Sequence, residues 1–193
     1  CQQLRYQRRI ANIAFDKHVT RIISDSLHII QITSIGEHIQ IEERIPFLRR
    51  IGMLFQNGAL LGSMTVGENI GLPYREHTTL PDAMIQRIVE SKLAMVGLPG
   101  TKGLFPSELS GGMRKRVALA RAIISPPDVI LYDEPTAGLD PIVSDSINKL
   151  IRHLQRELHV TSIVVTHDMV SCYHIADRVA LLNEGRIYFL GNQ

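Results

Sequence analysis

The most constraining feature of the sequence is a short apolar segment that ends in two neighbouring carboxylates. Residues 129–132, Val-Ile-Leu-Tyr, are followed at once by Asp133 and Glu134. A short run of large apolar residues bounded by breakers is typical of a strand that is buried on both faces. In open α/β sheets, ligands bind outside the carboxyl ends of such strands. One of the two carboxylates can hold Mg²⁺ through water, and the other can orient and polarise an attacking water.

A second signal lies upstream of this strand. Ser110, Gly111 and Gly112 open a helix-like run that extends to residue 124. Ser is a favourable N-cap, and Gly lets a ligand approach the backbone closely. The free N–H groups and the dipole of a helix N-terminus attract phosphate. Taken alone, a Ser-Gly-Gly helix start is usually a cap and turn, and an Asp-Glu pair after a strand is often a solvated turn. The informative feature is the order and spacing of both signals within one stretch.

The rest of the chain alternates between strand and helix patterns. Residues 179–182 and 186–190 flank Asn-Glu-Gly and predict a β-hairpin. We expect a largely parallel α/β core with an antiparallel β part and a helical insertion. Amphipathic spacing predicts a helix over 81–96, with Pro81 at the first helical position, and Pro141 opens a second helix over 141–158. Alternating Ile residues predict strands over 29–32 and 39–41. Further strands are predicted over 4–6, 10–15, 19–23, 51–55 and 160–166.

Two polar residues follow predicted strands elsewhere in the chain. Gln56 comes directly after residues 51–55, and His167 comes directly after residues 160–166. Alone, Gln56 before Asn-Gly would indicate a hairpin turn, and His167 would indicate a cap before a helix that starts at Asp168. A His just beyond a strand end can also reach a bound phosphate.

Composition limits the classes of function. The 193 residues suffice for one domain with a core, and a formal net charge of +2 argues against a dedicated nucleic-acid binder. The basic run at 114–116 is expected to be a solvated face. Two cysteines, Cys1 and Cys172, make no disulfide framework, which favours a reducing cytosol. No signal peptide is visible, and no apolar run is long enough to span a bilayer.

The stretch 109–140 resembles the ATP-binding-cassette (ABC) ATPase family, a P-loop NTPase-like fold. Residues 109–113 resemble its signature motif, 129–134 its Walker B motif and 137–140 its D-loop. The resemblance implies ATP and Mg²⁺ as cofactors and two subunits that clamp two ATP molecules head to tail. The resemblance implies that Gln56 and Asp133 bind Mg²⁺, that Glu134 is the catalytic base and that His167 contacts the γ-phosphate. It places Ser110, Gly111 and Gly112 at the partner subunit's phosphates and Asp140 in the D-loop. It also implies that Tyr6 stacks on adenine, although a strand aromatic that packs on the sheet is an equally good interpretation of Tyr6.

Within that family, the sequence is similar to the Mla-type ATPases of phospholipid transport. The similarity is carried by residues 51–60, 64–70, 109–113 and 116–122, although Met113 replaces the usual Gln of the signature. It implies an integral-membrane permease, contacted through residues 56–74, and a second ATPase subunit as partners. It also implies a peripheral location on the cytoplasmic face of the inner membrane.

One departure from the family is severe. The phosphate-binding loop G-x-x-x-x-G-K-[ST] is absent, since no Gly in the chain is followed by Lys. The loop belongs directly after Ile23, where about twenty residues, the loop with most of one helix, are missing. We therefore expect a single ABC ATPase domain over 1–193, incomplete at both ends, with an α/β core over 1–61 and 125–193 and a helical subdomain over 62–124.

Three interpretations follow from this departure. The chain is a decayed or internally deleted ABC ATPase, or it is a non-catalytic partner that lends Ser110, Gly111 and Gly112 to an intact subunit. A third possibility, an SMC-type DNA-repair ATPase, is weaker because no heptad arm is present in the sequence. The sequence alone does not separate the first two.

Overall fold

The computed structural model describes residues 48–183 and 186–192. Residues 50–193 form a compact unit of their own. The strands predicted within residues 4–41, the site of the missing loop after Ile23, and Tyr6 all lie outside the described residues.

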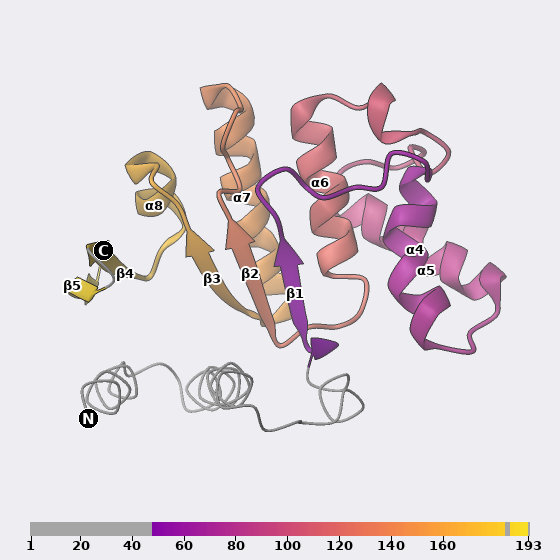
Figure 1. Cartoon of the computed structure of the whole chain (residues 1–193), viewed down its shortest axis with the longest axis horizontal. Coiled ribbons are helices and arrows are strands. Elements are labelled where there is room, and N and C mark those ends of the chain that lie inside the picture. Colours follow the sequence, from indigo (N-terminus) through magenta and orange to yellow (C-terminus); the bar gives the residue numbers. More distant parts are fainter. Residues whose placement is uncertain (1–47, 184–185, 193) are drawn as a thin grey trace, which may run out of the picture. The chain divides into compact units, whose positions relative to one another are not determined.

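Three parallel strands organise this unit (Figure 1). They are β1 (Ile51–Leu54), β2 (Val129–Asp133) and β3 (Thr161–Val165), in the spatial order β1-β2-β3. β1 pairs with β2 from Ile51↔Val129 to Leu54↔Tyr132, and β2 pairs with β3 from Val129↔Thr161 to Asp133↔Val165. The predicted mostly parallel α/β core is therefore confirmed, and parallel pairing sets all three carboxyl ends at one edge.

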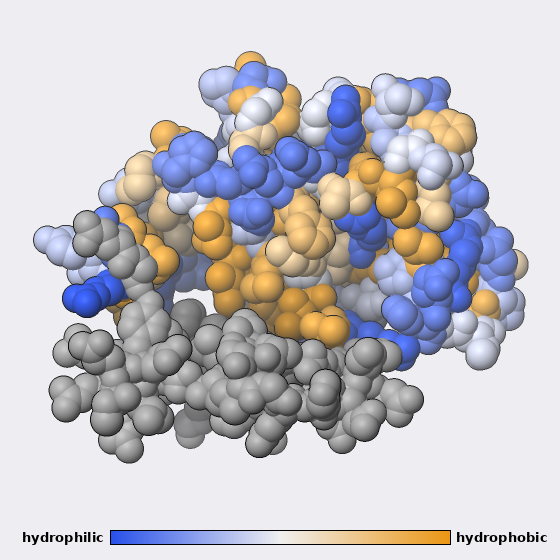
Figure 2. Space-filling model, in the orientation of Figure 1, coloured by the Kyte–Doolittle hydropathy of each residue, from blue (hydrophilic) through white to orange (hydrophobic). Residues whose placement is uncertain are grey.

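The two faces of this sheet differ in burial. Leu54, Ile130 and Tyr132 point to one face and are at most 1% exposed. Residues at alternate positions occupy the other face, where Met53 is 39% and Val165 is 62% exposed. In the space-filling view, apolar residues gather over the strands (Figure 2). The covered face packs against helices, since the side chains of α6 and α7 share a single core cluster with β1 and β2.

The helices follow the predicted order. α6 lies beside β1, and α7 lies behind the sheet in Figure 1. Among the described residues, no helix is long and apolar enough to cross a membrane. The helices are α4 (Val66–His77), α5 (Asp82–Met95), the 3₁₀ turn η1 (Pro106–Glu108), α6 (Gly111–Ala122), α7 (Pro141–Leu158) and α8 (Met169–Ile175).

An antiparallel hairpin ends the described chain, as the Asn-Glu-Gly turn signal predicts. Its strands are β4 (Arg178–Asn183) and β5 (Arg186–Asn192), with a register irregularity between Leu181 and Leu182. The hairpin is the antiparallel β part expected from the sequence.

Three expectations need correction. Pro81 is the N-cap of α5 and not its first helical residue. The apolar run at 160–166 predicts a buried strand, but the residues of β3 are half-buried to exposed, because β3 pairs with β2 on one side and forms the edge of the described sheet. The basic run 114–116 is not a solvated face: Lys115 is only 5% exposed and Arg116 is half-buried, because both side chains bond to groups from other elements.

Candidate functional site

Four of the predicted site residues lie at the same edge of the sheet, at the ends of its three strands. Gln56 follows β1, Asp133 ends β2 with Glu134 next to it, and His167 follows β3. Since the register pairs Leu54 with Tyr132 and Asp133 with Val165, the loops that follow the strands begin side by side.

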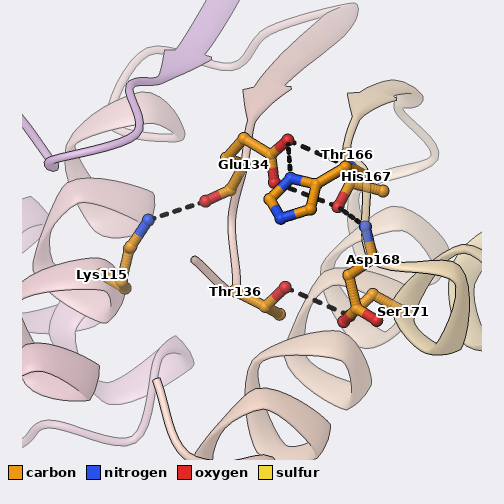
Figure 3. A network of polar contacts seen from close by, with 7 residues as sticks. All are labelled: Lys115, Glu134, Thr136, Thr166, His167, Asp168 and Ser171. Atoms are coloured by element: carbon orange, nitrogen blue, oxygen red, sulfur yellow. Dashed lines mark hydrogen bonds and ion pairs between the residues drawn. The ribbon is translucent and has the colours of Figure 1, made fainter. Parts of the chain in front are cut away.

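The carboxylate of Glu134 is the centre of this group (Figure 3). Its Oε1 accepts hydrogen bonds from the backbone N–H of His167 at 3.1 Å and from the ring Nδ1 of His167 at 2.7 Å. Its Oε2 accepts from the hydroxyl of Thr166 at 3.2 Å. The side chain of Glu134 is 17% exposed and that of His167 is 83% exposed. The pair therefore lies at the surface of the site, where a solute can reach the imidazole.

The two groups shift each other's protonation. Partial burial raises the pKa of Glu134, but the hydrogen bonds from the ring and backbone of His167 outweigh it, so the pKa lies below its ordinary value. The hydrogen bond and the charge of Glu134 raise the pKa of His167 above its ordinary value. Because an ionised carboxylate can only accept, Nδ1 of His167 carries the hydrogen in this contact.

The backbone of Glu134 is held in an unusual conformation. Its φ is +46°, in the left-handed region that non-glycine residues seldom occupy. Its N–H donates to the carbonyl of Val165 at 2.9 Å, and its own carbonyl accepts from the N–H of Ala137 at 3.2 Å. Surrounding bonds over-determine such a conformation, and outliers of this kind gather at functional sites.

Lys115 is a site residue that the sequence analysis missed. Its ammonium group donates to the carbonyl of Gln56 at 2.5 Å and to the carbonyl of Glu134 at 2.9 Å. Burial lowers the pKa of Lys115, and the charges of Asp133 and Glu134 oppose that effect. A signal was present: at helical spacing, Lys115 shares a face with the buried residues Ala118 and Leu119.

The predicted signature residues begin α6. Ser110 is the N-cap, and its hydroxyl accepts from the N–H of Met113 at 3.3 Å. The sequence predicts that the glycines admit a ligand, but Gly112 is also required for packing, because a Cβ there would lie 2.6 Å from Val143 Cγ1. A Cβ on Gly111 would lie 3.3 Å from Leu139 Cδ2.

The remaining predicted residues have simpler local surroundings. Asp140 is the N-cap of α7 and accepts from the N–H groups of Ile142 and Val143, both at 3.0 Å. Asp133 is half-buried and Gln56 is exposed. In the described part of the chain, no group of three or more His, Cys, Asp or Glu side chains is placed to hold a metal ion. One carboxylate at a strand end is nonetheless a donor set that suits Mg²⁺, which keeps waters and shares substrate phosphates.

A buried polar network lies behind the loop of His167 (Figure 3). The hydroxyl of Ser171 donates to Asp168 at 2.5 Å and accepts from the side-chain amide of Asn148 at 2.9 Å. Because its single hydrogen goes to Asp168, the hydroxyl of Thr136, 3.2 Å away, is the donor in their contact. The network ties α7 and the loop after β2 to the start of α8, directly beyond His167.

Proteins of known sequence are similar to this chain over most of its length. The chain is 48% identical over 139 residues to the intermembrane phospholipid transport system ATP-binding protein MlaF of Haemophilus influenzae, covering 72% of this chain and 53% of that protein. It is 42% identical over 140 residues to the probable ribonucleotide transport ATP-binding protein mkl of Mycobacterium tuberculosis, covering 72% of this chain and 39% of that protein. The chain thus spans about half the length of these relatives or less.

Solved structures match the fold as well. The dimeric ATP-binding cassette MJ0796, in a post-hydrolysis state bound to ADP and Pi, has a TM-score of 0.71 at 29% identity, covering 81% of this chain and 68% of that chain. cbiO1 from Clostridium perfringens, part of the cbiONQ transporter complex, has a TM-score of 0.72 at 32% identity, covering 79% of this chain and 61% of that chain.

The family itself follows from the sequence profile. The profile described as ABC transporter matches residues 19–137, more than half of the chain. Together with the ABC ATPase fold of the solved structures, this match shows that the chain belongs to the ABC transporter family.

Proposed function

We propose that this chain is an ATP-binding subunit of an ABC transporter that moves phospholipid, with ATP hydrolysis as its family reaction. The observation that carries the proposal is the contact between Glu134 and His167 at the carboxyl edge of three parallel strands, where the loop of Gln56 begins beside them. The identity to MlaF, named as an intermembrane phospholipid transport protein, supports phospholipid as the cargo. The proposed location is the cytoplasmic face of the inner membrane.

In the proposed mechanism, each residue has a defined role. Glu134 accepts the proton of the attacking water, and His167 donates a hydrogen bond to the γ-phosphate with its exposed ring. Asp133 and Gln56 would hold Mg²⁺ with the nucleotide phosphates, which neutralises charge that develops during phosphoryl transfer. Asp140, Ser110, Gly111 and Gly112 would face the nucleotide held by a second subunit, and Tyr6 would stack on adenine.

The test of the base is E134Q in an assembled transporter that contains this chain and hydrolyses ATP. Loss of a general base costs on the order of 10²–10⁴ in rate. Turnover should therefore fall strongly, while nucleotide affinity changes little. Turnover equal to that of the wild type would remove Glu134 from this role.

A second candidate function is that of a non-catalytic partner. The observation in its favour is the absence of G-x-x-x-x-G-K-[ST] from the sequence, since that loop supplies the N–H groups and the Lys that hold the β- and γ-phosphates. Such a partner would contribute only Ser110 and the following glycines to an intact subunit. Two measurements separate the candidates: ATP titration of this chain alone, and ATP hydrolysis by an intact family member with and without this chain. The partner is favoured if this chain alone does not bind ATP but stimulates ATP hydrolysis by the intact member, and if S110A removes that stimulation.

A groove supports the proposed permease contact. It encloses about 610 Å³ beside α4 and α5, within and next to the predicted contact stretch 56–74. Charged side chains of both signs reach it, including Glu68, Arg75 and Lys102.

The check of this contact is co-purification with an integral-membrane permease. E68K combined with R75E should reduce recovery of the permease, whereas E157Q on α7 should not. Recovery of nucleic-acid enzymes alone would contradict the proposal. The groove is lined by Met64, Thr65, Gly67, Glu68, Leu72, Arg75, Glu76, Asp82, Gln86, Lys102 and Gly103.

A further inference from the structure

The buried ammonium group of Lys115 bonds to the backbone of two loops. Lys115 is 5% exposed, and its ammonium group donates to two backbone carbonyls, those of Gln56 and Glu134. These residues are 59 and 19 positions away in the sequence and belong to different loops. Removing an ammonium group from water is costly, so its contacts must replace the lost hydration.

One of these two carbonyls belongs to a residue with an unusual backbone conformation. The carbonyl of Glu134 is part of a residue in the left-handed region, where φ is +46°. A left-handed non-glycine residue persists only while its neighbours hold it. Lys115 is one of the groups that hold it, and Figure 3 shows the ammonium group directed at the backbone of Glu134 while the carboxylate turns toward His167.

The helix that carries Lys115 also connects it to the signature motif. Ser110 caps α6, and Lys115 lies five residues further along the same helix, about 7.5 Å at 1.5 Å per residue. The same helix holds the loop after Gln56 a second time, since Arg121 donates to the carbonyls of Gly58 and Ala59 at 2.7 and 2.6 Å. A shift or rotation of α6 therefore moves both loops at the sheet edge.

We propose that Lys115 is a positioning residue, which fixes the backbone carbonyls of Gln56 and Glu134 and so aims the carboxylate of Glu134 at the reacting water. The proposal rests on the proposed function of Glu134 as the base. It also gives α6 a second role, because the helix whose N-terminus would meet the partner's nucleotide then sets the geometry of its own subunit's base.

The experiment measures the pKa of His167 by NMR in the full chain, without nucleotide, in the wild type, K115M, E134Q and K92M. Met is similar in length and unbranched but has no donors. If Lys115 positions Glu134, the carboxylate leaves His167 in K115M, and the pKa of His167 falls closer to that of E134Q than to that of the wild type. Loss of the lysine charge alone would raise this pKa, so the direction of the change separates positioning from simple electrostatics.

Lys92 is the control, because it is another helical lysine that is partly buried but contacts Met95 and not the site. K92M should leave the pKa of His167 at the wild-type value. A pKa in K115M at or above that of the wild type would overturn the proposal while leaving the proposed function intact. If K115M does not fold, NMR of the wild type provides the test. Hydrogen-bond couplings from Lys115 Nζ to the carbonyl carbons of Gln56 and Glu134 would support the positioning proposal, and their absence would refute it.

Discussion

At the scale of single residues, the contact between Glu134 and His167 makes a prediction about pH. In E134Q, the pKa of His167 should fall toward its ordinary value, because the hydrogen bond and charge that raise it are weakened or lost. A histidine ring titration by NMR measures this. E157Q, which alters an exposed carboxylate on α7, is the control and should not change it. An unchanged pKa in E134Q would show that the two side chains are apart in solution.

The sign of both shifts defines the pH window of this contact. The lowered pKa of Glu134 gives stability that is present above 4.5, its ordinary value, and is lost as the pH falls through the lowered value. The raised pKa of His167 gives stability that is present below 6.5, its ordinary value, and is lost as the pH rises through the raised value. Both contributions to stability are therefore fully present between pH 4.5 and pH 6.5, and one of them declines on either side of this range.

The buried network behind His167 makes a second prediction at this scale. S171A removes one hydroxyl that three side chains share, so Asp168, Asn148 and Thr136 each lose a bond. We expect a loss of about 1–3 kcal/mol in the free energy of unfolding, since buried groups are left without partners. The pKa of Asp168 should rise, because the Ser171 hydroxyl is the largest influence that lowers it.

Urea denaturation of S171A measures this loss directly. S91A, at an exposed position in the helix α5, is the matched control and should be neutral or slightly stabilising, because Ala is the better helix former. A stability of S171A within error of S91A would contradict the network.

At the scale of elements, the packing of α6 on β1 depends on one glycine. A Cβ on Gly52 would lie 2.4 Å from the carbonyl oxygen of Ala122 at the end of α6. A backbone atom cannot move aside as a flexible side chain can, so G52A should cost about 1–3 kcal/mol or more. G62A is the control, because a Cβ at Gly62 meets nothing within 4 Å. Equal urea midpoints for the two variants would mean that α6 does not pack on β1 in this way.

Elements were predictable where local chemistry alone defines them. α7 begins at Pro141 and ends at Leu158 as expected, because Pro suits the first helical position and the amphipathic spacing is regular. The environment of Lys115 was not predictable, because its two acceptors come from distant loops whose proximity depends on the order β1-β2-β3. The same sheet order explains β3: its apolar sequence favours a buried strand, but its position at the edge of the described sheet leaves Val165 exposed.

In the candidate site too, some features were predictable from local sequence and others depended on the fold. Glu134 and His167 were recognisable because both follow strand patterns, but their direct contact depends on the pairing of β2 with β3. Ser110 was predictable as a cap from its neighbours alone, whereas the close approach of Gly112 to Val143 required the packing of α6 against α7. Local signals therefore identified the residues, and long-range strand order determined what each residue contacts.

At the scale of the whole molecule, we expect the proposed deletion after Ile23 to lower both stability and nucleotide binding. A helix in that segment would bury large apolar side chains, each worth roughly 1.5–3 kcal/mol. The described sheet has a face suited to such a helix, opposite α6 and α7, where Met53 and Val165 remain 39% and 62% exposed. An exposed apolar face favours aggregation.

The last prediction is that inserting the missing segment restores both properties. We expect a chain with a G-x-x-x-x-G-K-S loop and an amphipathic helix inserted after Ile23 to melt at a higher temperature and to bind ATP in calorimetry. The chain with the present sequence, on its own, should melt at a lower temperature and should not bind ATP. The same insertion with Ala in place of the loop Lys is the control: it should keep the higher melting temperature, because the helix still covers the sheet, but lose most of the ATP affinity, because the cation at the β- and γ-phosphates is gone. Micromolar ATP binding by the chain without the insertion would refute this prediction, since other residues would then have to hold the phosphates.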